Sequence, residues 1–188
     1  MHADVERALL DSRTATGQWR ALAGELSHLQ ANWRPAPESW SIAQCMDHLT
    51  STTGPLVPAI KAAVTRARAS GRLSTGPFRY GFVATWFLRS LAPTGARRVR
   101  APGLYLPSAS DLDLAATASR FFAAQGAFEE AATSADGLDL ARVRVASPAL
   151  AILRLPLGIW LLATAAHTLR HLHQAQRVRT DPRFPGAA

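Results

Sequence analysis

The chain has 188 residues, 48% of them hydrophobic, and a formal net charge of +8. This length and composition predict a single domain spanning residues 1–188, with a sizeable core over about residues 5–180. The lone cysteine, Cys45, excludes an internal disulfide, and the residues after Met1 form no apolar secretory segment, so we expect a cytoplasmic protein.

The positive charge alone does not predict a nucleic-acid-binding protein. Arginine supplies all but one of the 21 basic residues, and these arginines are scattered along the chain. No helix-turn-helix, zinc-finger or aromatic-basic pattern accompanies them. The apolar run over residues 155–166 is shorter than the roughly 20 residues that a membrane-spanning helix needs. We therefore expect neither a specific nucleic-acid partner nor a membrane partner.

Two helices are expected in the first third of the chain. From Val5 onward, apolar residues recur mostly every third or fourth position, which predicts a first helix that ends near Asn32. The residues from Ser41 to Gln44 form a capping box, so a second helix begins at Ser41. Pro55 and Pro58 must kink or interrupt it before it ends in the arginine-rich residues 66–72.

A long, proline-containing connection follows over residues 71–110, with a short helix expected at Phe78–Leu91. A connection of this length permits a crossover between helices 2 and 3. Helix 3 begins at Ser110 or Asp111, has one buried face and ends at Gly137. A polar connector at 138–147 leads to the last helix, interrupted at Pro156 and then running from Leu157 to about Arg179. With no convincing strand pattern, the sequence predicts an all-α four-helix bundle.

The most informative polar residues are two histidines on the last expected helix. His167 and His171 are four residues apart, so their side chains point the same way and can grip one metal ion. They lie beside the apolar face of the helix, so they face the bundle interior or its rim. A buried histidine needs partners for both ring nitrogens, and a metal supplies one; two ordinary polar residues remain the alternative.

His48, two turns into the second helix, is the natural third ligand, because bundles commonly build metal sites from facing helices. Three histidines that leave a position open are typical of a catalytic site. A hydrogen-bonded core histidine is the alternative for His48. Gln44 and Cys45 lie one turn earlier and could approach the site, but the capping box explains Gln44, and packing beside the cap opposite Trp40 explains Cys45. No role is assigned to the other histidines, His2, His28 and His173.

Two segments resemble one known family. Residues 40–49 (WSIAQCMDHL) are similar to the start of the second helix of DinB-like proteins, a superfamily that includes the YfiT-type thiol transferases, and residues 166–178 (AHTLRHLHQAQRV) to its last helix. Residues 98–107 and 138–140 resemble its connecting segments, so the likeness covers about residues 10–180. The Phe78–Leu91 helix looks like an insertion, and no motif identifies a particular thiol. The Y-family DNA polymerase of similar name is unrelated.

The resemblance implies an up-down-down-up bundle, frequently homodimeric, in which His48, His167 and His171 hold nickel or zinc. The leading hypothesis is a metal-dependent enzyme, a thiol S-transferase or a hydrolase, whose partner is a small thiol or an electrophilic small molecule. No catalytic residue can be named. One alternative is a non-catalytic, dimeric stress-response bundle. A further one is binding of an anionic membrane or a nucleic acid through arginines, namely Arg66, Arg68, Arg72, Arg97, Arg98 and Arg100.

Overall fold

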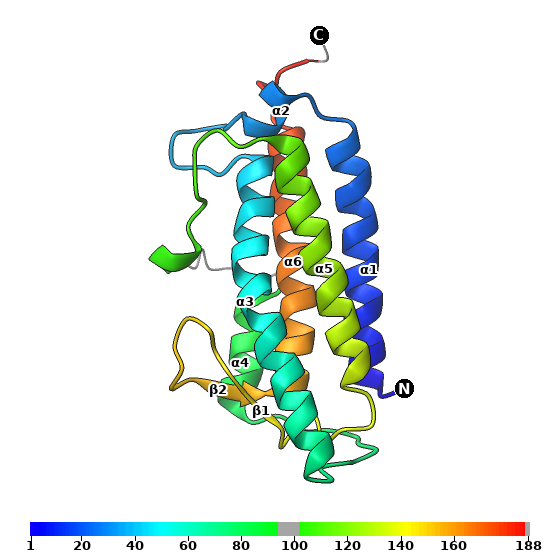
Figure 1. Ribbon diagram of the computed structural model, residues 1–188. Coiled ribbons are helices and arrows are strands. Elements are labelled where there is room, and N and C mark those ends of the chain that lie inside the picture. The colour runs from blue at the N-terminus through cyan, green and yellow to red at the C-terminus, as the bar shows by residue number, and fades with distance from the viewer. Residues whose placement is uncertain (94–101, 187–188) are drawn as a thin grey trace.

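The computed structural model describes residues 1–93 and 102–186 and is mostly helical, which confirms the all-α class (Figure 1). Of the arginines proposed for anion binding, Arg97, Arg98 and Arg100 lie outside these residues. Four long helices lie side by side: α1 (Ala3–Gly24), α3 (Ile42–Ala69), α5 (Leu114–Ser134) and α6 (Leu157–Arg179). Helix α1 packs on α5 and α6, and α3 packs on the same two helices.

Smaller elements lie around the four long helices. They are α2 (His28–Asn32), α4 (Phe82–Leu91), the 3-10 turn η1 (Gly103–Tyr105) and the strands β1 (Arg144–Ala146) and β2 (Arg154–Pro156). Helix α4 packs against α6, and α2 lies at the end of the bundle where α3 begins (Figure 1). No helix within the described residues is long and apolar enough to cross a membrane.

The core is built where the apolar faces of the long helices meet. Trp19 of α1 and Phe121 of α5 are fully buried, with ring centroids 5.4 Å apart in an edge-to-face arrangement. The indole Nε1 of Trp19 donates a hydrogen bond to the backbone oxygen of Thr168. Because a buried indole N–H needs an acceptor, this bond ties α1 to α6 close to the residues that carry the histidines.

The first expected helix is in fact two helices. Helix α1 ends at Gly24, and α2 begins after Ser27, whose hydroxyl accepts from the backbone N–H of Gln30 while the Gln30 side chain accepts from that of Ser27. This second capping box restarts the helix in a new direction, so the prediction of one helix to Asn32 was wrong. The apolar spacing continued across the break and concealed it.

Helix α3 begins where the sequence predicted. Ser41 is its N-cap, and Gln44 completes the capping box. The prolines at positions 55 and 58 lie inside one continuous helix, so they do not interrupt it. Helix α3 ends at Ala69, as the arginine-rich residues indicated.

Two later helix starts differ from expectation, and one connector contains strands that the sequence did not predict. Helix α5 begins at Leu114 rather than at Ser110 or Asp111, because Asp113 is the N-cap and accepts from the backbone N–H of Ala116. The short helix begins at Phe82 rather than Phe78. The connector before α6 contains a small antiparallel hairpin in which Val145 pairs with Leu155. These strands have three residues each, too few for an alternating pattern to stand out. Helix α6 runs from Leu157 as predicted, but Pro156 is the last residue of β2 and does not interrupt a longer helix.

Candidate metal centre

The three predicted histidines come together between α3 and α6. His48 is on α3, and His167 and His171 are one turn apart on α6, in the half of the helix nearer its C-terminus. One ligand atom from each side chain lies within 4.8 Å of those of the other two, a grouping that could hold a metal ion. His48 and His171 are buried, and His167 is half-buried.

The three Nε2 atoms face one another. The Nε2 of His167 lies 3.3 Å from that of His48 and 3.0 Å from that of His171. A neutral imidazole carries its one proton on either Nδ1 or Nε2. When the protons are on the Nδ1 atoms, three Nε2 lone pairs face one another with no hydrogen-bond donor between them. A cation at their centre would satisfy all three.

The backbone of η1 determines the protonation of His48. Its Nδ1 lies 2.6 Å from the backbone oxygen of Tyr105, and because a carbonyl only accepts, the proton is on Nδ1. The Nε2 of His48 therefore presents a lone pair to the other two histidines. Metal-binding histidines are typically oriented in this way, through the ring nitrogen that does not face the metal.

Burial keeps the three imidazoles neutral. Desolvation lowers the pKa of His48, and the hydrogen bond to the Tyr105 carbonyl only partly opposes it. Desolvation, followed by repulsion from His48 and Arg170, lowers the pKa of His167 to about 3. The pKa of His171 is lowered well below its usual value, again mainly by desolvation. Neutral imidazole is the form that binds a metal, so the donor set fits a divalent cation.

Trp40, just before α3, covers one side of the histidine group. Its ring lies 4.7 Å from that of His48 and 5.7 Å from that of His171, with an angle of 19° between the planes of the indole and the His171 ring. The sequence indicated only a packing role for Trp40 at the start of the helix. The only sequence signal for this contact was a tryptophan eight residues before His48. The helix cap at Ser41 lies between the two residues, so their spacing does not predict that the rings stack.

The structure also tests the two neighbours that could approach the site. Cys45 is fully buried in the core, where burial raises the pKa of its thiol to about 12, so it is neither a ready ligand nor a reactive thiol. Gln44 caps α3, and its amide also donates to the backbone oxygen of Ala109. Capping and packing therefore account for both residues.

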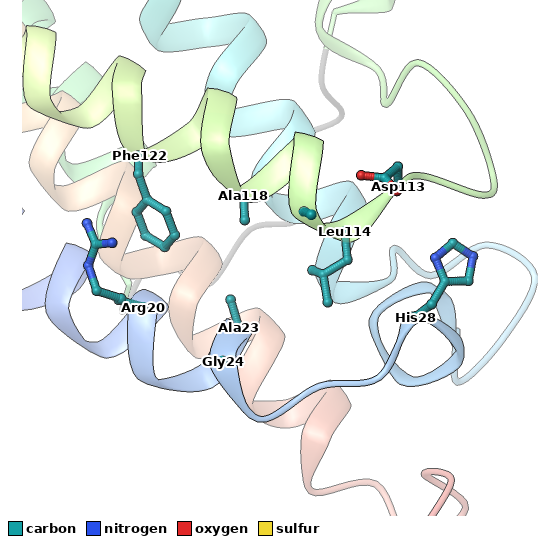
Figure 2. A pocket seen from close by; sticks show the side chains of 9 residues that line it. Arg20, Ala23, Gly24, His28, Asp113, Leu114, Ala118 and Phe122 are labelled. Carbon is teal, nitrogen blue, oxygen red and sulfur yellow. The ribbon is translucent and has the colours of Figure 1, made fainter.

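The remaining histidines lie away from the centre. His173 is exposed, and His28 pairs with Asp111 at 2.9 Å on the surface. His2 precedes α1, and its backbone N–H donates a hydrogen bond to the Asp136 carboxylate. His28 also lines an open groove of about 530 Å³ between α1 and α5, which contains none of the three site histidines (Figure 2). In that groove, Arg20 lies over the ring of Phe122 at 4.3 Å.

The helical fold and the histidine group define a helical protein with a candidate metal centre. The family model of the DinB superfamily matches residues 13–175, and the chain belongs to that superfamily. The match includes all three histidines and Trp40. No curated protein and no solved structure matches the chain.

Proposed function

We propose that His48, His167 and His171 hold one divalent ion, nickel or zinc, and that the protein is a metal-dependent enzyme acting on a small molecule. The observation that carries the proposal is the convergence of three neutral Nε2 atoms, one of them oriented by the Tyr105 carbonyl. Imidazole suits both metals, and the resemblance to DinB-like proteins favours them over copper or iron.

The reaction that best suits this site is the transfer of a small thiol to an electrophile, with hydrolysis as the second choice. When bound, a divalent ion supplies Lewis acidity and lowers the pKa of a coordinated thiol or water, which gives a nucleophile near neutral pH. Three protein ligands leave a coordination position for such a group. Trp40 would exclude water from one side of the site and leave approach from the others.

The proposal includes the arrangement of the whole chain. In Figure 1, α1 and α6 run toward the end that carries α2, whereas α3 and α5 run away from it, which supports an up-down-down-up bundle with a crossover between α3 and α5. A single domain over residues 1–188 is consistent with a family match that spans most of the chain. A cytoplasmic homodimer rests on the sequence and on the family resemblance alone.

A non-catalytic role has one specific observation in its favour. The histidines come from two helices, so a metal ion would cross-link α3 to α6 and stabilise the bundle without any reaction. Binding without turnover would be sufficient for such a role.

A turnover assay separates the two functions. Metal-loaded protein would be mixed with low-molecular-weight thiols and electrophiles, and loss of the electrophile followed by mass spectrometry. The enzyme proposal predicts turnover that is lost in His171→Ala and retained in His173→Ala, an exposed neighbour on the same helix. Full metal loading without turnover of thiols, esters or amides would favour the structural role.

A further inference from the structure

The outward face of α4 carries large apolar side chains that the fold does not use. Phe82 is 84% exposed, Val83 is 63% exposed and Trp86 is 59% exposed. These residues lie on one side of the helix, because positions four apart are neighbours on a helical surface. Arg79 precedes the group and Arg89 follows it, and both are exposed.

The opposite face of α4 already fixes the helix to the protein. Ala84 is buried, and the ring of Phe87 lies 5.2 Å from that of Trp160 on α6. Arg170 of α6 donates to the backbone oxygens of Ser90 and Ala92 at the end of α4. The outer aromatic residues are therefore not needed to hold α4 in place.

A second apolar group lies at the same end of the molecule. Leu150 and Ile152, in the turn between β1 and β2, are 56% and 86% exposed. Trp160 of α6 links the hairpin to α4, because its ring lies 5.2 Å from that of Phe87 and its indole Nε1 donates to the backbone oxygen of Val145. We call the exposed residues of this end the α4 face: Phe82, Val83, Trp86, Leu150 and Ile152.

The segments that form the α4 face contain no acidic residue. Residues 62–110 and 140–180 lack Asp and Glu entirely, so all 13 acidic residues lie elsewhere in the chain. The acidic residues are therefore segregated from these segments, although the arginines are spread along the whole chain. Around the α4 face, these segments contribute exposed arginines, namely Arg79, Arg89, Arg144 and Arg154.

We propose that the α4 face docks on an anionic lipid surface, with Phe82 and Trp86 inserted at the interface. A short helix with Phe and Trp on the outside and arginines around it has the composition of an interfacial segment. Each arginine near an anionic bilayer adds attraction that salt weakens. This proposal departs from the expectation of no membrane partner, which rested on the absence of a spanning segment. It places anionic-membrane binding at other arginines than those of the alternative weighed from the sequence.

The observations favour lipid over the two other occupants. A second copy of the chain would bring two arginine-rich faces together, and like charges repel. A nucleic acid would pair with the arginines but would leave the apolar side chains exposed to water, because phosphate backbones offer them no apolar partner. An anionic lipid surface satisfies both the charge and the exposed apolar side chains.

The test is co-flotation of the full chain with phosphatidylcholine vesicles, with and without phosphatidylglycerol. The wild-type protein should float only with the anionic vesicles, and less at high salt. The double variant Phe82→Ser, Trp86→Ser should bind about tenfold more weakly or worse, because it loses the apolar anchor. Leu29→Ser is the matched control, since Leu29 is 68% exposed at the far end of the bundle. Circular dichroism would verify that all variants fold.

Each other outcome overturns the proposal. Equal flotation of the double variant would show that α4 is not the anchor, and no flotation of the wild type would exclude lipid. Tighter binding to duplex DNA than to vesicles would assign the face to nucleic acid. A dimer in sedimentation that the double variant loses would assign it to a second copy.

Discussion

The Nδ1 atom of His48 lies 2.6 Å from the backbone carbonyl oxygen of Tyr105. The two residues are far apart in sequence, and the contact orients the imidazole so that its Nε2 lone pair faces His167 and His171. A mutation at position 105 leaves the carbonyl in place, so the contact is better tested by spectroscopy than by substitution.

We predict that His48 is the Nδ1–H tautomer in the metal-free protein. Long-range nitrogen–proton NMR correlation distinguishes a protonated from an unprotonated ring nitrogen, and should show Nε2 of His48 without a proton. The exposed His173, which lies outside the histidine group, is the internal control for the assignment of the ring signals. A proton on Nε2 of His48 would contradict this orientation of the imidazole.

The metal-free protein should lose stability as the pH falls below 6.5. The pKa of His171 is lowered well below the ordinary histidine value of 6.5, so it stays neutral in the folded state while the unfolded chain takes up a proton. The stability contributed by the neutral form is thus complete above pH 6.5 and declines below it, by up to about 1.4 kcal/mol per pH unit for one proton.

Urea denaturation between neutral and acidic pH measures this effect. His171→Gln removes one titrating group and should reduce the pH dependence of the unfolding free energy, while His48 and His167 maintain the remainder. His173→Gln, on an exposed site, should not change it. An unchanged slope in His171→Gln would show that the imidazole is already protonated in the folded protein.

Trp40 should position the histidines. Trp40→Ala removes the ring that stacks on His171 and contacts His48, and we expect zinc or nickel affinity to fall by about 10- to 100-fold, as for other residues that orient metal ligands. Trp40→Phe should recover most of the affinity. The control is Trp33→Ala, because the Trp33 ring packs edge-to-face against Phe184 instead. Competition titration with a chromophoric chelator measures the affinities, and equal values for Trp40→Ala and wild type would contradict the role.

The Ser41 cap should stabilise the helix that carries His48. Ser41→Ala removes the acceptor for the backbone N–H of Gln44 at a fully buried position, and should cost about 1 kcal/mol of unfolding free energy. Thr65→Ala is the control, because Thr65 is exposed later on the same helix and its hydroxyl donates to the Lys61 carbonyl of the preceding turn. Chemical denaturation compares the two, and an equal effect of both substitutions would argue against the cap.

Local signals explain which features could be predicted from the sequence. The capping box at Ser41 and the proline before Leu157 lie within a few residues of the helix starts they specify, so both boundaries were confirmed. The spacing of His167 and His171 follows from the period of one helix. The break after Gly24 was missed because the apolar period continues across it into α2.

The rest of the site depends on contacts between distant segments. The sequence offered two reasons to place His48 beside the α6 histidines. It was the one other histidine expected to face inward, and the resemblance to DinB-like proteins implied the same set of ligands. The Tyr105 carbonyl belongs to the backbone, which has no sequence signature, and the stacking of Trp40 requires the positions of both helices. The hairpin before α6 was missed because three-residue strands carry almost no pattern.

Metal content tests the central claim most directly. Untagged protein would be incubated with zinc or nickel, desalted and analysed by plasma mass spectrometry, alongside His48→Ala, His167→Ala, His171→Ala and the control His173→Ala. We predict close to one metal ion per chain in the wild type and in the control, with strong loss in each of the three site variants. Protein that stays metal-free, or metal that persists in the site variants, would contradict a metal centre at these histidines.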